Sequence, residues 1–348
     1  MATLTLRSGR QIGDYLQPYI VAELNTSHFG DMAIARSMID QAKAAGCDCV
    51  KFQSWSTDTL YASSFYQEKA NAIAKRIVSK FSLEESQLLE LAQYCQSIGM
   101  DFSSTPYARN EAEFLAQRCG VPFIKIASME LNNLPYLAFL GSLQVPLVLS
   151  TGMGTLEEIV RAVDTITKTG NQQLVILHCI SVYPAAPATI RLHNILGLRS
   201  EFPNHPIGYS DHTIGSEIPS AAVALGACLI EKHFTLDSRR IGMDNQMATE
   251  PEAMKAMVGA CHRVHEAMGG TGRLLDSQEQ AQIVKMRRSV VTARALKAGH
   301  RLTLDDLDAK RPGNGIAPSE MASLVGHVLT VDLAADVLIL PEQIEAQG

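Results

Sequence analysis

Short apolar segments recur along the first 270 residues, and segments with the spacing of amphipathic helices separate most of them. Strands that are buried on both faces appear as such runs, whereas helices repeat their apolar positions every three or four residues. The runs cover residues 19–24, 49–53, 101–104, 123–128, 146–151, 174–179, 207–211 and 227–233. The clearest helical patterns cover residues 32–45, 86–98, 157–167 and 218–225. Eight strand–helix units in succession predict an α/β fold, a (β/α)8 TIM barrel.

A doubly wound open sheet is the competing arrangement of the same units. No glycine-rich fingerprint follows the first predicted strand, as a dinucleotide-binding sheet of that kind would require. Polar residues instead close nearly every predicted strand, namely Glu23, Lys51 with Gln53, Ser104 with Thr105, Lys125 with Ser128, Ser150 with Thr151, His178, Asp211 with His212, and Glu231 with His233. In a barrel these strand ends surround the active site, so the pattern favours the barrel.

Two histidines stand at the ends of two consecutive predicted strands. The alternation of side chains along a strand places Ser210 with His212, and Glu231 with His233, on one face, while Lys232 points away. Two imidazoles on neighbouring strands can share one divalent metal ion. Each histidine could also be an ordinary core or capping residue, and the residues alone leave both interpretations open.

Two segments depart from the repeat. Residues 54–82 form a connection longer than most strand–helix loops, and they include the aromatic residues Trp55, Tyr61, Phe65 and Tyr66. They are either a lid or a helical decoration held by those aromatics. After residue 270 the pattern changes, which predicts a barrel domain over 1–270, a polar linker over 271–288 and a small turn-rich β domain over 289–348. A unit of about 60 residues is near the lower limit for independent stability, so we expect it to dock on a partner surface.

Composition narrows the class of protein. The 348 residues are 46% hydrophobic, and the formal net charge of −6 argues against a general nucleic-acid or membrane surface role. The seven cysteines are an odd number and include no CxxC pair, so they indicate reduced core thiols. The amino-terminal residues lack the apolar core of a secretion signal, and no apolar stretch has membrane-spanning length. We expect a cytoplasmic protein.

Nine short motifs give a more specific indication when they are considered together. They are Ala22-Glu23, Val50-Lys51-Phe52-Gln53, Ser104-Thr105-Pro106, Lys125-Ile126-Ala127-Ser128, Leu149-Ser150-Thr151-Gly152-Met153, Leu177-His178-Cys179, Ile207-Gly208-Tyr209-Ser210-Asp211-His212-Thr213, Glu231-Lys232-His233-Phe234-Thr235 and Lys310-Arg311-Pro312-Gly313-Asn314-Gly315. In content and order they resemble the sialic acid synthase family, which condenses phosphoenolpyruvate with a sugar to make nine-carbon keto sugar acids. The resemblance covers nearly the whole chain. It implies a TIM barrel followed by a small β-rich antifreeze-like (SAF-type) domain.

The resemblance also implies a set of site residues. His212 and His233 match the family's metal ligands, with Mn²⁺ the usual ion and Mg²⁺ or Co²⁺ as alternatives. The positions that match those holding phosphoenolpyruvate are Lys51, Thr105, Lys125, Ser128, Ser150 and Ser210. The two lysines also have a physical argument, because a buried Lys without an anionic partner costs several kcal/mol. Each serine taken alone is equally well explained as a strand-end cap.

Further matches concern the sugar and the assembly. Glu130, Tyr183 and Asp244 match sugar-binding positions, and Glu23 matches a carboxylate placed near the reacting carbons. Arg311 matches a residue that reaches from the antifreeze-like domain of one subunit into the barrel of the other. The resemblance therefore implies a domain-swapped homodimer, although Arg311 stands in a segment that also has the composition of an ordinary surface turn.

Two departures from the family pattern bear on the substrate. Residues 25–28 are Asn-Thr-Ser-His where the family often has Asn directly before this His. Residues 241–247 are Ile-Gly-Met-Asp-Asn-Gln-Met where Pro-Gly-Pro-Asp is familiar, which changes the wall expected to face the sugar. The acceptor is then N-acetylmannosamine, a diacetamido-trideoxyhexose or another N-acyl hexosamine.

The expected activity is an aldol-like, carbon–carbon bond-forming transfer. Phosphoenolpyruvate attacks the aldehyde of the open-chain sugar, water adds to C2, and phosphate leaves. Two alternatives stay open. One is a related phosphoenolpyruvate aldolase acting on a phosphorylated aldose, and the other is a non-catalytic protein that binds glycans or ice.

Overall fold

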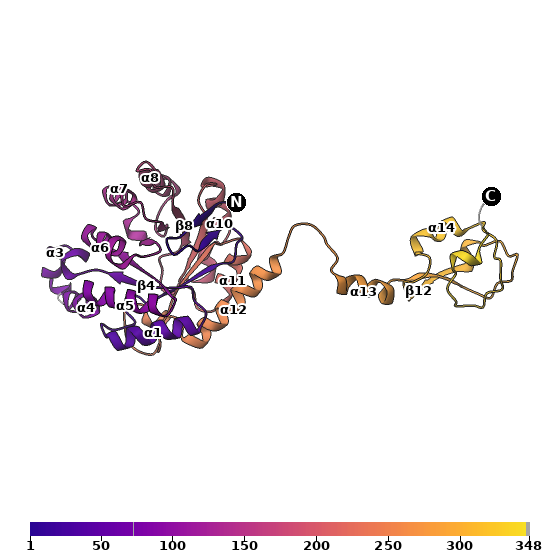
Figure 1. The fold of residues 1–348 in the computed structure, drawn as a ribbon, viewed down its shortest axis with the longest axis horizontal. Coiled ribbons are helices and arrows are strands. Elements are labelled where there is room, and N and C mark those ends of the chain that lie inside the picture. Colours follow the sequence, from indigo (N-terminus) through magenta and orange to yellow (C-terminus); the bar gives the residue numbers. More distant parts are fainter. Residues whose placement is uncertain (72, 346–348) are drawn as a thin grey trace. The chain divides into compact units, whose positions relative to one another are not determined.

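The computed structural model describes residues 1–71 and 73–345, and it separates the chain into two compact units, Met1–Gly269 and Gly270–Gly348. Figure 1 shows both units as ribbons. None of the described helices is long and apolar enough to cross a membrane.

Eight parallel strands form the centre of the first unit. They are β3 (Tyr19–Glu23), β4 (Cys49–Ser54), β5 (Asp101–Pro106), β6 (Ile124–Ile126), β7 (Leu147–Ser150), β8 (Leu174–Cys179), β9 (Ile207–Asp211) and β10 (Leu229–His233). Their hydrogen-bonded order is β5-β4-β3-β10-β9-β8-β7-β6, so β5 and β6 stand at the two ends of the ladder. The Ser103 hydroxyl of β5 donates to the carbonyl of Phe123 over 2.8 Å, which bridges these ends. The predicted TIM barrel is confirmed.

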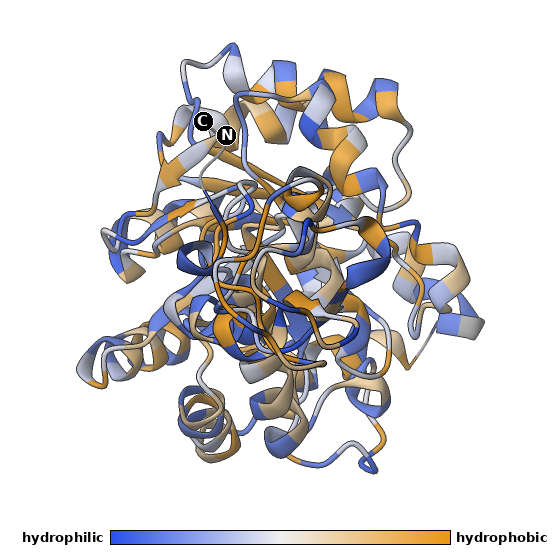
Figure 2. Cartoon of the chain, turned by 90° about the vertical axis from the view of Figure 1, so that its right-hand side faces the viewer, coloured by the Kyte–Doolittle hydropathy of each residue, from blue (hydrophilic) through white to orange (hydrophobic). Residues whose placement is uncertain are grey.

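Helices follow most of the strands and cover the outside of the barrel (Figure 1). The main ones are α1 (Met32–Ala44), α5 (Glu85–Ser97), α6 (Arg109–Phe114), which continues into the π-helical segment η2 (Leu115–Cys119), α7 (Leu134–Ser142), α8 (Leu156–Thr167), α10 (Asn194–Glu201), α11 (Glu217–Ala224) and α12 (Pro251–Met268). In Figure 2 the peripheral helices alternate hydrophilic and hydrophobic residues, as amphipathic helices do. Helix α1 is typical, because Asp31 caps its first turn and the stripe it buries is Ala35, Met38, Ile39 and Ala42.

Side chains alternate along each strand between the inside and the outside of the barrel, and the inward ones are of two kinds. Inward-pointing residues of several strands, such as Tyr19 and Val21, pack with an amino-terminal hairpin. This hairpin pairs β1 (Thr3–Thr5) with β2 (Gln11–Gly13) and contributes Leu4, Leu6 and Ile12 to the same apolar cluster. Inward positions near the strand ends are polar instead. The apolar half of the barrel therefore supports a polar half at the carboxyl ends of the strands.

The long connection after β4 is helical. It contains α2 (Thr57–Leu60), α3 (Ser63–Gln67), the 3₁₀ turn η1 (Lys69–Asn71) and α4 (Ala74–Phe81). Trp55, Val78 and Phe81 form a small buried cluster under it, and the rings of Tyr61 and Phe65 stack with centroids 4.5 Å apart. Among the described residues of this segment, the aromatic side chains thus pack against the helices, as expected for a helical decoration held by aromatics. Trp55, Leu60 and Tyr61 also line the cavity described below, so the same segment forms a wall of the site.

The second unit has its own core. Strands β11 (Ser289–Thr292) and β12 (Leu307–Lys310) pair antiparallel, and α14 (Met321–Leu324) follows. Burial raises the pKa of Asp306, but hydrogen bonds from His300, Thr303 and Arg294 outweigh it and hold that pKa below its usual range. The stretch expected to be a linker contains a helix, α13 (Ser277–Met286), whose first turn Asp276 caps.

Candidate active site

A cavity of about 340 Å³ opens at the carboxyl ends of the barrel strands. Eleven of the thirteen site residues expected from the sequence line it, namely Glu23, Lys51, Thr105, Lys125, Ser128, Ser150, Tyr183, Ser210, His212, His233 and Asp244. They come from every strand of the barrel or from the loop that follows it. Parallel strands thus bring distant parts of the sequence to one place.

Two expected site residues do not line the cavity. Glu130 ends the short 3₁₀ turn η3 (Ser128–Glu130), and its carboxylate accepts a hydrogen bond from Asn133 over 2.8 Å. Its neighbour Met129 lines the cavity instead. Arg311 is exposed and belongs to the second unit, directly after β12. The geometry of the first unit therefore says nothing of a contact between Arg311 and the barrel.

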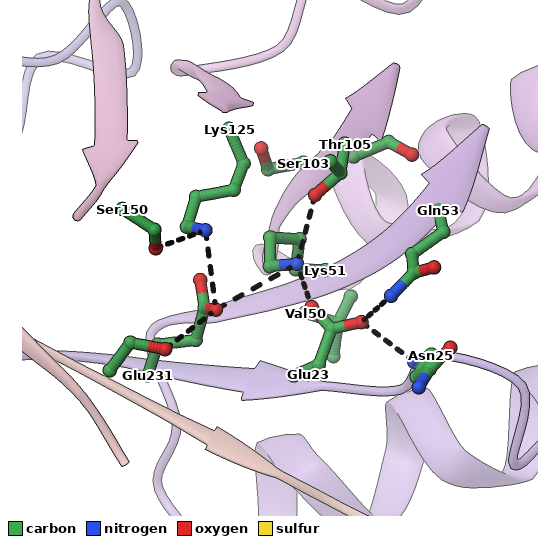
Figure 3. Close-up of polar contacts among 12 residues, drawn as sticks. Glu23, Asn25, Val50, Lys51, Gln53, Ser103, Thr105, Lys125, Ser150 and Glu231 are labelled. Carbon is green, nitrogen blue, oxygen red and sulfur yellow. Dashed lines mark hydrogen bonds and ion pairs between the residues drawn. The ribbon is translucent and has the colours of Figure 1, made fainter. Parts of the chain in front are cut away.

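The floor of the cavity holds two lysines and two glutamates, all buried (Figure 3). Lys51 forms an ion pair with Glu23, and its Nζ lies 3.9 Å from Oε1 of Glu231. The Nζ of Lys125 lies 3.6 Å from the same Glu231 oxygen. Both lysines consequently have carboxylate partners within the protein. Glu23 and Glu231 thus supply the anionic partners that buried lysines need.

Hydroxyl groups complete the hydrogen bonds of these charges. Lys51 donates to Thr105 over 3.0 Å, and Lys125 donates to Ser150 over 2.8 Å (Figure 3). Ser210 donates to Glu231 over 3.2 Å. Burial lowers the pKa of Lys51 to about 7, although Glu231 acts in the opposite direction. Burial raises the pKa of Glu231, but Lys125 and Lys51 outweigh it, so the pKa of this carboxyl falls below its ordinary value. Glu231 therefore stays an anion beneath the cavity.

The two histidines lie next to this floor. The ring centroids of His212 and His233 are 5.4 Å apart, and the ring of Tyr183 lies 4.2 Å from that of His212. Burial lowers the pKa of His233 well below its usual range, and the positive charges of His212 and Lys51 act in the same direction. Nδ1 of His212 lies 2.7 Å from the carbonyl of Ile180, so a neutral His212 ring donates through Nδ1 and keeps Nε2 as its acceptor. Burial lowers the pKa of this ring, but Cys179 outweighs burial and raises that pKa above its usual value.

The expected direction of Lys232 is confirmed. Its ammonium group lies 2.5 Å from Asp211 and 2.7 Å from the carbonyl of Thr213, on the side away from the cavity. Asp211, although adjacent to His212 in sequence, also accepts hydrogen bonds from Tyr209 and Thr213. Strand alternation thus separates a structural ion pair from the histidine pair.

Several cavity residues were not expected from the sequence as site residues. Glu231 has the clearest signal, because its spacing of two from His233 places both on one face of β10. Gln53 has the same relation to Lys51 on β4, and its side chain lies 3.5 Å from Glu23. Asn25 and Met243 come from loops, for which strand alternation gives no guide.

Comparisons with known proteins agree with this fold. Residues 38–273 match the NeuB family, and residues 287–345 match the SAF domain. The chain is 38% identical to the N,N'-diacetyllegionaminic acid synthase of Legionella pneumophila, covering 96% of each chain, and 34% identical to the N-acetylneuraminate-9-phosphate synthase of Drosophila melanogaster, covering 94% of this chain and 95% of that protein. A crystal structure of the N-acetylneuraminic acid synthetase of Leptospira borgpetersenii has a TM-score of 0.73 at 31% identity, covering 81% of this chain and 95% of that one.

These similarities define the class as a barrel synthase with a carboxyl-terminal SAF domain. The chain belongs to the NeuB family, the sialic acid synthases, and it is an enzyme. The family resemblance and the antifreeze-like domain expected from the sequence are confirmed.

Proposed function

We propose that this enzyme condenses phosphoenolpyruvate with the open-chain aldehyde of an unphosphorylated N-acyl hexosamine, giving a nine-carbon 2-keto sugar acid and phosphate. One observation carries the proposal. Lys51 and Lys125, with the hydroxyls they contact, form the floor of a cavity whose wall contains His212 and His233. Ammonium and hydroxyl donors that converge on one closed end suit a compact anion such as phosphoenolpyruvate.

The donor set beside that floor fits a divalent metal ion. His233 is held neutral, and a neutral His212 that donates through Nδ1 to the carbonyl of Ile180 keeps Nε2 as its ligand atom. Within residues 1–71 and 73–345 no group of three or more His, Cys, Asp or Glu side chains converges, so water and the substrate would supply the remaining ligands. When bound, the ion supplies electrophilic activation of the acceptor aldehyde. Mn²⁺ is the ion we propose, with Mg²⁺ and Co²⁺ as alternatives.

Charge gives a second argument for the ion. Lys51 and Lys125 are already paired with Glu23 and Glu231, so the floor brings no excess positive charge. Phosphoenolpyruvate carries a phosphate and a carboxylate, and burying both beside a balanced set needs further compensation. A divalent cation held by His212 and His233 meets that need.

Each group on the floor then has a defined task in the condensation. Lys51 and Lys125 hold the phosphate and carboxylate, with Thr105, Ser128, Ser150 and Ser210 as hydroxyl partners. C3 of phosphoenolpyruvate forms the new bond to the aldehyde carbon, a water molecule adds to C2, and phosphate leaves with the former enol oxygen. Glu23, paired with Lys51 and accepting the backbone N–H of Asn25, takes the proton of the attacking water. This proton balances the one that the former aldehyde oxygen gains on becoming a hydroxyl, and the proton of the C2 hydroxyl leaves with phosphate as the ketone forms.

The outer walls of the cavity bear on the acceptor. Among the described lining residues, the only lysine or arginine side chains are Lys51 and Lys125 on the floor. The outer part includes apolar side chains, namely Trp55, Leu60, Tyr61, Met129, Met153 and Met243. A phosphorylated aldose would need a second cationic site, whereas methyl and acyl groups fit such walls. A diacetamido-trideoxyhexose is the acceptor these walls favour, in agreement with the legionaminic acid synthase among the relatives.

The acceptor is tested by measuring phosphate release from phosphoenolpyruvate and Mn²⁺ with a panel of sugars. The panel contains N-acetylmannosamine, its 6-phosphate and a 2,4-diacetamido-2,4,6-trideoxyhexose. We expect the highest kcat/KM with the diacetamido sugar and the lowest with the phosphate. Preference for the phosphate would reject the unphosphorylated acceptor, and no release with any sugar would reject the synthase activity.

The mouth of the barrel supports the proposed domain-swapped homodimer. Large apolar side chains are exposed on the loops that follow five successive strands, namely Met129, Met153, Val182, Ile214 and Ile241. Apolar patches of this kind mark interaction surfaces, and a small domain needs a surface on which to dock. The SAF domain of a second copy would cover the rim and bring its Arg311 to the acceptor.

The seven free thiols, six of them buried, support a reducing compartment, and we place the enzyme in the cytoplasm.

Complementation between two inactive variants tests this arrangement. An Arg311→Ala chain keeps an intact barrel, and a His233→Ala chain keeps an intact SAF domain. A swapped mixed dimer has one complete site, so we expect phosphate release to recover in co-expressed chains although neither homodimer is active. Recovery is absent if Arg311 acts within its own chain, and that result in demonstrated heterodimers would reject the swap.

A further inference from the structure

Asn25 occupies a backbone conformation that few residues adopt. It lies two residues after the last residue of β3 and has a φ of 39°, in the left-handed region where Asn and Gly are favoured. In this conformation its backbone N–H donates to Oε1 of Glu23 over 2.9 Å. The backbone of Asn25 therefore fixes one oxygen of the carboxylate to which we assign the proton transfer.

The side chain of Asn25 contacts a second carboxylate. Its Nδ2 lies 2.5 Å from Oδ2 of Asp244, which stands on the loop after β10. Because an ionised carboxylate only accepts hydrogen bonds, this contact identifies the amide nitrogen and leaves Oδ1 as an acceptor. Oδ1 is buried and has no hydrogen-bond partner among residues 1–71 and 73–345. Asn25 is 3% exposed and lines the cavity.

The loop that carries Asp244 is fixed independently. Asn245 is 1% exposed, and its amide donates to the carbonyls of Asp237 and Arg240 over 2.9 and 2.7 Å. The Thr235 hydroxyl donates to its Oδ1 over 2.5 Å. These hydrogen bonds within the loop fix its backbone. The backbone of Asp244 is therefore positioned without the help of Asn25.

We propose that Asn25 is a specificity-determining residue for the sugar acceptor. It sets the separation of Glu23 and Asp244, and its unpartnered Oδ1 accepts a hydrogen bond from a hydroxyl or amide N–H of the acceptor. A buried acceptor atom without a partner is destabilising, and a donor on the ligand removes that penalty. The unpartnered Oδ1 of Asn25 and the carboxylate of Asp244 both present acceptor atoms, so this corner favours a donor-rich part of the sugar. The inference rests on the proposed function and adds a residue that reads the acceptor.

Replacing Asn25 with glycine is the sharpest test, because glycine tolerates the backbone conformation and removes only the side chain. We expect the KM for the acceptor to rise about tenfold or more, the loss of roughly one hydrogen bond to a charged or buried group. The KM for phosphoenolpyruvate should stay within about twofold of the wild-type value, because Asn25 makes no contact with either floor lysine. Gln144→Gly is the matched control, since Gln144 has a φ of 54° and does not line the cavity.

Two further variants distinguish recognition of the acceptor by Asn25 from a purely structural role of this residue. Asn25→Asp keeps the size and the acceptor atom but removes the N–H that Asp244 receives, so the acceptor KM should rise here too. If Asn25 acts partly through Asp244, the effects of Asn25→Gly and Asp244→Ala should be clearly non-additive in the double variant. Circular dichroism establishes that each variant is folded.

An unchanged acceptor KM in folded Asn25→Gly and Asn25→Asp would overturn the inference, as would an equal rise in the KM of both substrates. The proposed function would survive either result, because the wild-type enzyme would still release phosphate with a sugar acceptor. Wild-type inactivity with every acceptor would instead overturn the proposed function and this inference together.

Discussion

Replacing His212 or His233 with alanine is expected to lower kcat by about a thousandfold or more without unfolding the barrel. The two ring centroids lie 5.4 Å apart at the strand ends, and Nε2 of a neutral His212 can bind a ligand because Nδ1 faces the carbonyl of Ile180. Loss of electrophilic activation of an aldehyde costs several kcal/mol in the transition state, and each 1.36 kcal/mol is a factor of ten in rate. Steady-state phosphate release measures the loss, and circular dichroism checks the fold.

Removal of the metal should have the same effect as removal of its ligands. A chelated and dialysed sample should lose turnover, and Mn²⁺, Co²⁺ or Mg²⁺ should restore it to the wild type but not to the His233→Ala variant. Zn²⁺ should bind tightly yet restore less activity, because affinity does not guarantee a productive geometry. Full activity in a sample shown to be free of metal would contradict the assignment of His212 and His233.

The second large effect concerns phosphoenolpyruvate. Lys125→Met should weaken its binding by roughly 2–4 kcal/mol, because an anionic group of the substrate loses its ammonium partner in a closed site. The change also leaves Glu231 with one cation fewer, since Lys125 lies 3.6 Å from it. The double variant Lys125→Met with Glu231→Gln separates the two causes. Recovery of most of the affinity in the double variant would show that repulsion by Glu231 dominates.

Lys232→Met is a matched control for this experiment. Lys232 is as deeply buried as Lys51 and Lys125, but its partners are Asp211 and the carbonyl of Thr213, outside the cavity. We expect it to lower thermal stability while the KM for phosphoenolpyruvate stays near the wild-type value. A KM for phosphoenolpyruvate that is unchanged in Lys125→Met and in Lys51→Met would refute the role of the floor lysines.

The barrel could be predicted from the sequence because its pattern is repetitive and each strand is buried on both faces. The apolar runs at 19–24, 174–179 and 207–211 each match a strand of the barrel to within a residue at either end. Helix α13 was not expected, because Ser277–Met286 buries none of its residues and so lacks a clear apolar stripe. The sequence left the structure of residues 54–82 undecided for a related reason. Their helices are held by aromatic packing and do not show a clear apolar periodicity.

The site could be predicted only as far as strand alternation extends. His212 and His233 follow from it, as does the outward direction of Lys232. The pairing of the lysines with Glu23 and Glu231 could not be foreseen. It depends on the neighbouring positions of β3, β4 and β10 in the sheet, and on a contact between Lys125 of β6 and Glu231 of β10, which are not neighbouring strands. Asn25 was noticed only as a departure in sequence, since its role depends on a left-handed backbone and on a contact with a residue 219 positions away.

The carbon–carbon bond itself is the most direct test of the account. The enzyme is incubated with Mn²⁺, [3-¹³C]phosphoenolpyruvate and a 2,4-diacetamido-2,4,6-trideoxyhexose, and the product is examined by ¹³C NMR. The account predicts that the label appears in a methylene carbon bonded to the former aldehyde carbon of the sugar, in an amount equal to the phosphate released. Label found only in the methyl group of pyruvate would show hydrolysis without condensation and would contradict the synthase assignment.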